Sequence, residues 1–242
     1  MKSAFIFLGA ALSCTTPVFA QEAGFFAGID GGAAFRSGSS GTTNGGAAYA
    51  GGATLTDVKF DDTYLVGGHV GYRFNPRLAA FVSYEHIAGD VSWTADFANP
   101  TSSSTFLSGE AVSDVIMANV AYRYALADAT ALNFGAGVGI SINKLKGVTE
   151  FVRGSSYAEV AGDTKTGLAA RAMIGVEHQL SNAVSFGANI ALAYFDGFTT
   201  GDERFIPAAA IIPGLSPTEA IGPYEIDDVW GGTVSAFIKV QF

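Results

Sequence analysis

Charged and polar side chains recur in this sequence inside segments that alternate between bulky apolar residues and small or polar ones. Successive side chains of a strand point to opposite faces, so these charges share the face opposite the apolar one. The set that we assign to this face is Asp30, His69, Arg73, Glu85, Asn119, Arg123, Arg171, Glu177 and Lys239. Both signs are present, as buried charges require. They could form an ion path with exchangeable salt bridges or a polar plug that fills a narrow interior, and we favour the plug.

Other chemistry finds little support in the sequence. The histidines are His69, His86 and His178, and no two have the spacing of metal ligands. His86 with Asp90 comes closest to a catalytic pair, as in a lipid-modifying enzyme, but no serine is placed beside it. The glycines at 135, 137 and 139 are followed by no helix, so they are not a dinucleotide motif; they make room for long side chains from neighbouring strands. We expect no enzyme and no catalytic, cofactor or metal site.

Eight segments with a two-residue period would position the inward charges. They are Gly24–Arg36, Thr63–Phe74, Leu78–Ile87, Val112–Tyr124, Leu132–Asn143, Thr166–His178, Val184–Tyr194 and a closing segment within 228–242. Each is roughly 10 to 13 residues long, enough to cross a thin bilayer at a tilt. The pattern therefore predicts eight amphipathic strands.

Long and short connections alternate between these segments. The long ones are Ser37–Asp61, Gly89–Ala111, Lys144–Asp163 and Phe195–Ile226. The first is rich in glycine, serine and threonine, and we expect it to be a mobile loop. Long loops on one side and tight turns on the other are typical of outer-membrane barrels, whose turns and termini lie in the periplasm.

The last strand is the clearest of the eight. Its apolar face consists of Val234, Ala236, Ile238, Val240 and Phe242. A final strand that ends on phenylalanine resembles the closing strand of bacterial outer-membrane barrels, which is an assembly signal for the barrel-assembly machinery. Unpaired backbone groups in hydrocarbon cost several kcal/mol, so the first strand must pair with the last. We predict an all-β fold, an eight-stranded antiparallel up-and-down transmembrane β-barrel with long outer loops and short periplasmic turns.

Composition supports a membrane location. Hydrophobic residues make up 49% of the chain and charged residues only 14%, against about 25% charged in an average soluble protein. No run of about 18 apolar residues follows the first twenty, so no transmembrane helix is expected. A soluble barrel would have the apolar face inside, but the opposite face then lacks the lysine and glutamate of a water-facing surface.

The amino-terminus predicts export. Residues 1–20 carry Lys2, an apolar centre and a small-residue site for cleavage between Ala20 and Gln21, which leaves 21–242 as the barrel domain. A lipoprotein acylated at Cys14 is the alternative. Cleavage changes the net charge from −9 to about −10 through loss of Lys2. An acidic chain is unsuited to nucleic acid but could bind divalent cations at a lipopolysaccharide surface.

An apolar stretch interrupts the fourth predicted loop. Its bulky members are Phe205, Ile206, Ile211 and Ile212. Exposed apolar patches often mark interaction sites, so this stretch is a candidate contact with host or cell surfaces. The alternative is that it folds over the barrel mouth or packs on another loop.

Several of these segments together resemble one family. The opening GFFAGIDGG strand, Val70–Phe74, Ala118–Tyr122 and the terminal Phe242 are similar to small outer-membrane β-barrel proteins, namely the transmembrane half of OmpA and the opacity-type surface antigens. The resemblance implies an outer-membrane location and lipid and lipopolysaccharide as neighbours. Roles in that family include surface antigen, adhesin, envelope stabiliser and small channel. We expect a non-enzymatic surface or envelope role, with a narrow diffusion channel as the first alternative and a lipid-modifying enzyme as the second.

Overall fold

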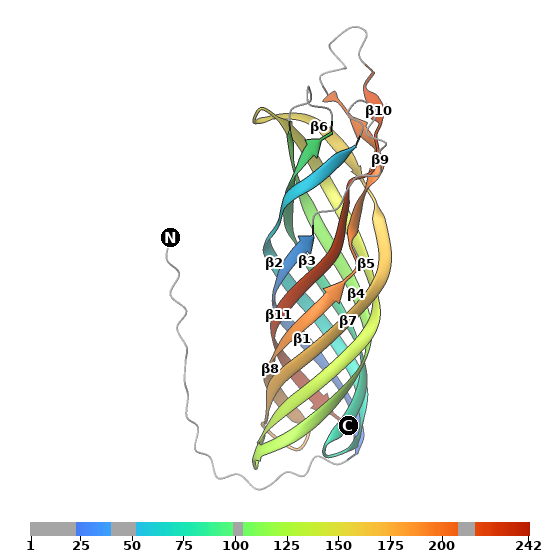
Figure 1. The fold of residues 1–242 in the computed structure, drawn as a ribbon. Coiled ribbons are helices and arrows are strands. Elements are labelled where there is room, and N and C mark those ends of the chain that lie inside the picture. The colour runs from blue at the N-terminus through green and yellow to red at the C-terminus, as the bar shows by residue number, and fades with distance from the viewer. Residues whose placement is uncertain (1–22, 40–51, 99–103, 208–215) are drawn as a thin grey trace, which may run out of the picture.

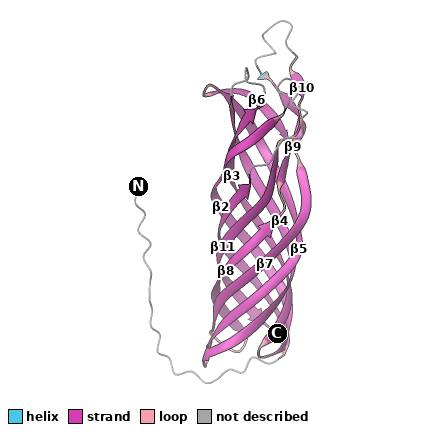
Figure 2. Cartoon of the chain, in the orientation of Figure 1, coloured by secondary structure: helices cyan, strands magenta, loops and turns pink. Residues whose placement is uncertain are grey.

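The computed structural model describes residues 23–39, 52–98, 104–207 and 216–242, which form strands almost throughout (Figures 1 and 2). The strands are β1 Gly24–Ser39, β2 Ala53–Asn75, β3 Leu78–Phe97, β4 Thr105–Ala127, β5 Thr130–Val152, β6 Ser155–Gly162, β7 Thr164–Gln179, β8 Val184–Phe195, β9 Phe198–Phe205, β10 Thr218–Ala220 and β11 Glu225–Gln241. Among the residues described, no helix is long and apolar enough to cross a bilayer.

Eight of these strands form a closed antiparallel ring. Each pairs with its neighbour in the order β1, β2, β3, β4, β5, β7, β8 and β11. The ring closes where β1 pairs antiparallel with β11, with Ile29 opposite Ile238. The predicted eight-stranded barrel is therefore confirmed, and its closure leaves no open edge toward lipid.

The two ends of the barrel differ. One end carries the tight connections β2–β3, β4–β5 and β7–β8 and the C-terminus, and we call it the turn end (Figure 1). At the opposite end, the loop end, β6, β9 and β10 extend the wall beyond the ring. They pair in the order β5, β6, β9 and β10, and β9 also touches β11.

The expected long loops are largely strands. Strands β2 to β5 each span 20 to 23 residues rather than the expected 10 to 13. Parts of 37–61, 89–111, 144–163 and 195–226 that were predicted to be loops pair as β-sheet. Their inward side chains, such as Leu55 and Leu107, are fully buried. Residues 40–51, at the centre of the predicted mobile loop, lie outside the described ranges.

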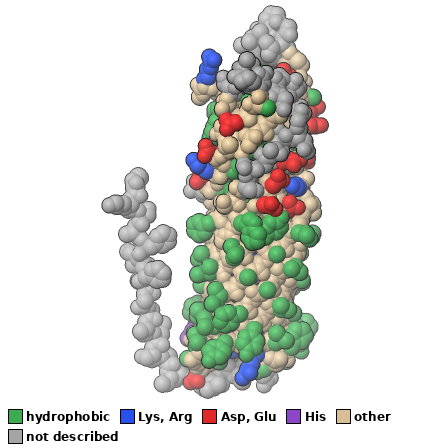
Figure 3. Space-filling model, in the orientation of Figure 1, with side chains coloured by type: hydrophobic (Ala, Val, Ile, Leu, Met, Phe, Trp, Pro, Cys, Tyr) green, Lys and Arg blue, Asp and Glu red, His purple; other side chains and the backbone are tan. Residues whose placement is uncertain are grey.

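The outer wall carries the predicted apolar face. Figure 3 shows hydrophobic side chains in a band over the turn-end half of the barrel, with charged side chains gathered beyond it. Phe74 and Tyr122 lie at one edge of the band and Tyr64 and Trp230 at the other, all on exposed wall positions, and Tyr72 lies half-buried beside Phe74. Tyr64 and Phe74 are about ten residues apart on β2, which at about 3.4 Å per residue and a tilt of about 40° spans about 25 Å. This matches the apolar height of a membrane barrel.

The lumen at the loop end is filled by an apolar core. All eight ring strands contribute to it, together with β6 and β9. Its largest fully buried side chains include Trp93, Tyr224, Phe195, Phe198, Leu55 and Leu107. The ring is therefore packed shut at this end rather than open.

Candidate functional site in the barrel lumen

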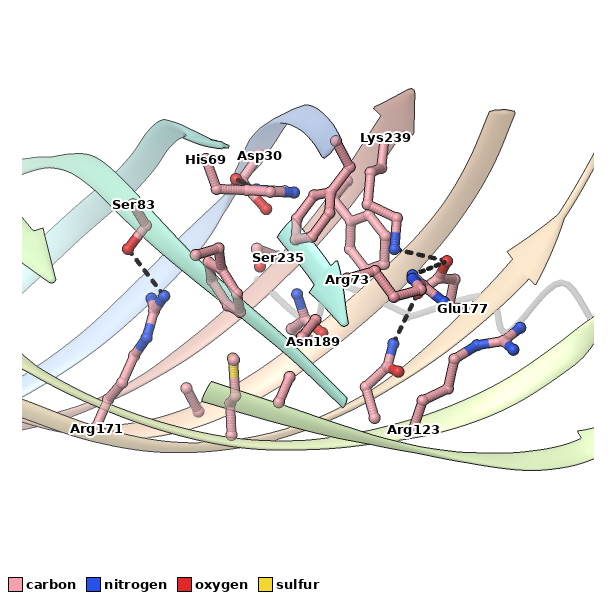
Figure 4. Close-up of a pocket in the computed structure, with 18 of the residues that line it drawn as sticks. Asp30, His69, Arg73, Ser83, Arg123, Arg171, Glu177, Asn189, Ser235 and Lys239 are labelled. Atoms are coloured by element: carbon pink, nitrogen blue, oxygen red, sulfur yellow. Dashed lines mark hydrogen bonds and ion pairs between the residues drawn. The ribbon is translucent and has the colours of Figure 1, made fainter. Parts of the chain in front are cut away.

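The turn-end half of the lumen contains a polar cavity with a water-accessible volume of about 80 Å³ (Figure 4). Eight of the nine inward residues predicted from the sequence line it: Asp30, His69, Arg73, Glu85, Arg123, Arg171, Glu177 and Lys239. The ninth, Asn119, is buried beside Arg171. Glycine makes room for it, because a Cβ at Gly137 would collide with the Asn119 side chain.

The first cluster surrounds Arg171 on β7. Its guanidinium forms an ion pair with Glu85, and Nε donates to Asn119 Oδ1 at 2.9 Å. A third bond runs from Nη2 to Ser83 Oγ at 3.0 Å. Because every nitrogen of this guanidinium has an acceptor, Arg171 locks β3, β4 and β7 together across the lumen.

The second cluster lies nearer the turn end and surrounds Glu177. Lys239 Nζ lies 2.6 Å from Glu177 Oε1, and Arg73 Nη2 lies 3.8 Å from the same oxygen. Asn133 Nδ2 donates to Glu177 Oε2 at 3.0 Å. Arg123 lines the same cavity, although its guanidinium is directed away from Glu177 in Figure 4. This cluster therefore gathers more cations than carboxylates.

His69 forms a third, smaller group. Its Nδ1 lies 2.8 Å from Asp30 Oδ2. The ring of His69 packs among Phe26, Phe81 and Phe237, with centroid distances of 5.7 to 6.3 Å. Phe81, which breaks the polar pattern of its strand in the sequence, is thus part of an aromatic cage inside the barrel.

Arg36 is buried against the apolar core and was not singled out in the sequence. Its guanidinium donates to the Ala111 carbonyl at 3.0 Å and to Ser113 Oγ at 3.4 Å. It also lies over the rings of Phe60 and Phe198, at 4.8 and 5.6 Å from their centroids. The signal was available, because Arg36 has the same inward parity as Asp30 on β1.

The suggested pairing of His86 with Asp90 is wrong. His86 Nδ1 lies 2.8 Å from Asp114 Oδ1, on the neighbouring strand β4. Asp114 also accepts from the Tyr84 hydroxyl at 2.7 Å and lies 3.4 Å from Lys144 Nζ. The group belongs to the polar edge of the apolar band. Within the described ranges, no three potential metal-ligating residues come together.

A charged cluster at the loop end also escaped the sequence analysis. Arg204 on β9 donates to Glu150 at 3.0 Å and to Glu219 at 2.6 Å, and its guanidinium lies over the Tyr157 ring. Glu150 is only 1% exposed. Burial, together with the second carboxylate, raises the pKa of Glu150 above its usual value, although Arg204 opposes the shift. All of these residues lay in segments predicted to be loops.

The apolar stretch of the fourth loop divides into two parts. Phe205 is 43% exposed, whereas Ile206 is buried and packs with Ala158 and Tyr157. The burial of Ile206 therefore agrees with the alternative in which this stretch packs on another part of the loop end. Ile211 and Ile212 lie outside the described residues.

The closing strand lies where the barrel seals. β11 pairs with β1 on one side and β8 on the other. Its outward residues are Val234, Ala236, Ile238, Val240 and Phe242, and all five are exposed on the wall.

A sealed antiparallel barrel with an aromatic-edged apolar band and a polar interior is a bacterial outer-membrane β-barrel. The chain belongs to the family described as outer membrane protein beta-barrel domain, whose model matches residues 6–206. The turn end accordingly faces the periplasm and the loop end faces the outside.

Solved structures of outer-membrane barrels are similar to this chain. Neisserial surface protein A is 18% identical, with 91% of this chain and 99% of that chain covered and a TM-score of 0.45. The outer membrane protease OmpT from Escherichia coli is 11% identical, with 90% and 97% covered and a TM-score of 0.48. OprG from Pseudomonas aeruginosa is 15% identical, with 92% and 98% covered and a TM-score of 0.44. A comparison with the curated proteins finds no match.

Proposed function

We propose that the protein is a non-enzymatic outer-membrane barrel with a closed lumen, which acts through the surface that its loop end presents outside the cell. The observation that carries this proposal is the apolar core across the loop-end lumen. Trp93, Leu107 and Phe198 are each 0% exposed. Packed interiors leave few voids larger than a water molecule, so ions have no continuous aqueous path through this layer.

The narrow diffusion channel is the alternative, and the polar cavity of the turn-end half is the feature that favours it. Beyond that cavity toward the loop end, Arg36 is only 7% exposed, and its guanidinium lies over the rings of Phe60 and Phe198. Conduction would require Arg36 and the apolar core to move together. The closed barrel is the simpler proposal.

The exposed outer wall at the loop end supports a surface role because it is acidic. Within the described ranges, its exposed acidic residues are Asp57, Asp61, Asp90, Asp96, Glu110, Glu159, Asp163, Asp202, Glu203 and Asp228, whereas Lys59, Lys146 and Arg153 are the exposed basic ones. Asp61, Asp90 and Glu110 lie directly opposite one another across three strands. Adjacent like charges repel, and Lys146, opposite Glu110, offsets only part of this negative charge. The acidic surface as a whole would therefore attract divalent counter-ions, which bridge to lipopolysaccharide phosphates or to other anionic cell surfaces.

Conductance separates the closed barrel from the channel. The purified protein is inserted into planar bilayers and its current is recorded, with a general porin as the positive control. A closed barrel gives no steady current above the bare membrane. A reproducible conductance step from the wild-type protein would replace the proposal with the channel.

Cation-dependent binding tests the surface role. Asp90→Asn removes the central charge of the acidic row, and Asp128→Asn, at a periplasmic turn, is the matched control. We expect Mg²⁺-dependent binding of lipopolysaccharide to weaken several-fold in Asp90→Asn and to stay unchanged in Asp128→Asn. Equal binding by all three proteins would remove this row as a contact. Unaltered lipid A masses with and without the protein would support the absence of lipid-modifying activity.

The same proposal includes export and assembly. Cleavage after Ala20 would leave Gln21 as the first residue, and an intact mass that retained residues 1–20 would contradict it. The outward face of β11 would present the assembly signal to the barrel-assembly machinery. Phe242 is 79% exposed at the turn end and is the residue to delete in an assembly assay.

A further inference from the structure

We propose that the turn-end half of the lumen is a binding site for a small dianionic oxyanion of the size of inorganic phosphate, held by Arg73, Arg123 and Lys239. The inference concerns the interior of the barrel and does not depend on the proposed surface role.

The cavity is lined by more cations than carboxylates. The cations are Arg73, Arg77, Arg123, Arg171 and Lys239, and the carboxylates are Asp30, Glu85 and Glu177. Two of the carboxylates are engaged locally, since Glu85 pairs with Arg171 and Asp30 with His69. Among the described residues that line the cavity, Glu177 is then the one carboxylate left to balance Arg73, Lys239 and Arg123, which gives these residues a surplus of about two positive charges.

Buried hydrogen-bond donors point to the same ligand. Arg73 is only 3% exposed. Among the described residues, its Nε and Nη1 atoms and the Nε atom of Arg123 have no hydrogen-bond acceptor. Buried guanidinium N–H groups require acceptors. The two oxygens of Glu177 already accept from Asn133 and face Lys239 and Arg73, so they do not supply those acceptors.

The chemistry of these donors selects an oxyanion. Guanidinium groups bind phosphate and carboxylate through parallel N–H bonds, and lysine adds a point charge. A dianion would neutralise the surplus charge and offer oxygens to both unsatisfied guanidinium groups. Chloride would supply one charge and none of the divergent acceptors.

Size and access limit the ligand. A volume of about 80 Å³ holds a few water molecules or one phosphate-sized ion and excludes a nucleotide. Asn75, Arg77 and Leu78, at the β2–β3 turn, also line the cavity, so it reaches the periplasmic end. The apolar core blocks the other end. The ligand is therefore a free anion that enters from the periplasm.

Calorimetric titration of the full chain with inorganic phosphate tests the site. The protein is kept in a sugar detergent, which carries no phosphate, at fixed ionic strength with chloride as the competing anion. We expect saturable binding with one phosphate per chain. Arg123→Gln removes a side chain that forms no ion pair in the described part of the chain, and it should weaken phosphate binding at least ten-fold. Arg153→Gln removes the same charge at the exposed tip of the β5–β6 hairpin and should bind as the wild type does.

A second variant is expected to act in the opposite direction. Glu177→Gln removes the carboxylate that competes with the ligand, so phosphate should bind more tightly, by several-fold. Heat-modifiable migration on a gel verifies that each variant forms a barrel. Three results would each overturn the proposal: no saturable phosphate binding by the wild type, equal weakening in Arg153→Gln, or unchanged binding in a folded Arg123→Gln barrel. The first would leave a water-filled cavity as the explanation of the unpaired donors.

Discussion

The two halves of the lumen have opposite chemistry inside one continuous wall. In the turn-end half the interior is polar, with Arg171 and Glu177 as the centres of its clusters. In the loop-end half the interior is apolar, with Trp93 and Phe198 fully buried. The outer surface has the opposite arrangement: apolar side chains cover the turn-end half, and charged side chains gather on the loop-end half (Figure 3). In each half, the wall of the barrel therefore has one polar and one apolar face. The medium outside, lipid or water, decides which of the two faces inward.

This inversion has a physical basis. Within the membrane a polar interior keeps the two faces of each strand distinct, because a one-residue slip would move charges into lipid. Beyond the membrane the wall faces water, so the same distinction requires the apolar face to lie inside. The comparison predicts different responses to substitution in the two halves.

The largest expected effect is in the apolar core. Trp93→Ala removes a fully buried side chain and leaves a cavity, which should lower the free energy of unfolding by about 3–5 kcal/mol. Trp230→Ala is the control, because Trp230 lies on the outer wall and is 52% exposed. Urea unfolding in lipid vesicles measures both. Equal losses for the two variants would show that the loop-end lumen is not a packed core.

A one-sided charge deletion tests the polar half. Arg171→Met leaves Glu85 buried without its ion-pair partner and should cost about 3 kcal/mol or more. The double variant Glu85→Met with Arg171→Met removes both charges and should recover part of that loss. A double-mutant cycle from unfolding midpoints gives the coupling free energy. A double variant as unstable as the sum of the single ones would contradict coupling between the two residues.

Glycine-to-alanine substitutions compare the interior with the lipid face, and their expected effects on stability are smaller. A Cβ at Gly139 on β5 would collide with the carbonyl oxygen of Ile116, so Gly139→Ala should cost about 1–3 kcal/mol. Gly31 on β1 has open space around it, and Gly31→Ala should change stability by less than about 1 kcal/mol. Thermal or urea unfolding measures the difference. A destabilising Gly31→Ala would mean that this wall position is packed.

The smallest effect concerns pH at the loop end. Burial raises the pKa of Glu150 in the folded state. The folded barrel therefore holds this proton more tightly than the unfolded chain, and the resulting stabilisation is full below the usual pKa of about 4.3 and is lost as pH rises through the raised value. Between those limits, the unfolding free energy of the wild type should fall more steeply with pH than that of Glu150→Gln. Parallel pH profiles would show that Arg204 cancels the effect of burial.

The sequence predicted the membrane-spanning half well and the outer half poorly. Strict alternation in 132–143, and alternation broken only by Phe237 in 234–242, are enough to assign the faces of β5 and β11, because lipid on one side and packed side chains on the other demand it. At the loop end the two-residue period slips. Register shifts occur at Thr56/Lys59 and Ser108/Glu110, and Asp57 and Gly147 have φ values of 53° and 56°. β-bulges of this kind change which residues point inward, so a periodic search stops there although the strand continues.

The partners inside the lumen depended on tertiary structure. That Arg171 and Glu177 face inward follows from parity, but their partners Glu85 and Lys239 come from strands far away in the sequence. The same is true of His86, which bonds to Asp114 rather than to nearby Asp90. Strand tilt and stagger decide which side chains share a level in a barrel, and neither is encoded in the period of a single strand.

The sequence by itself determined that this chain forms eight amphipathic strands, that the ring must close, and which face meets lipid, because those properties depend on the order of residues within each strand. Only the tertiary structure decided that the strands continue beyond the membrane, that an apolar core seals the loop end, and that Arg73 and Lys239 gather around Glu177 in a cavity that Arg123 also lines. These features arise from contacts between strands, whose register is set by the closed ring as a whole.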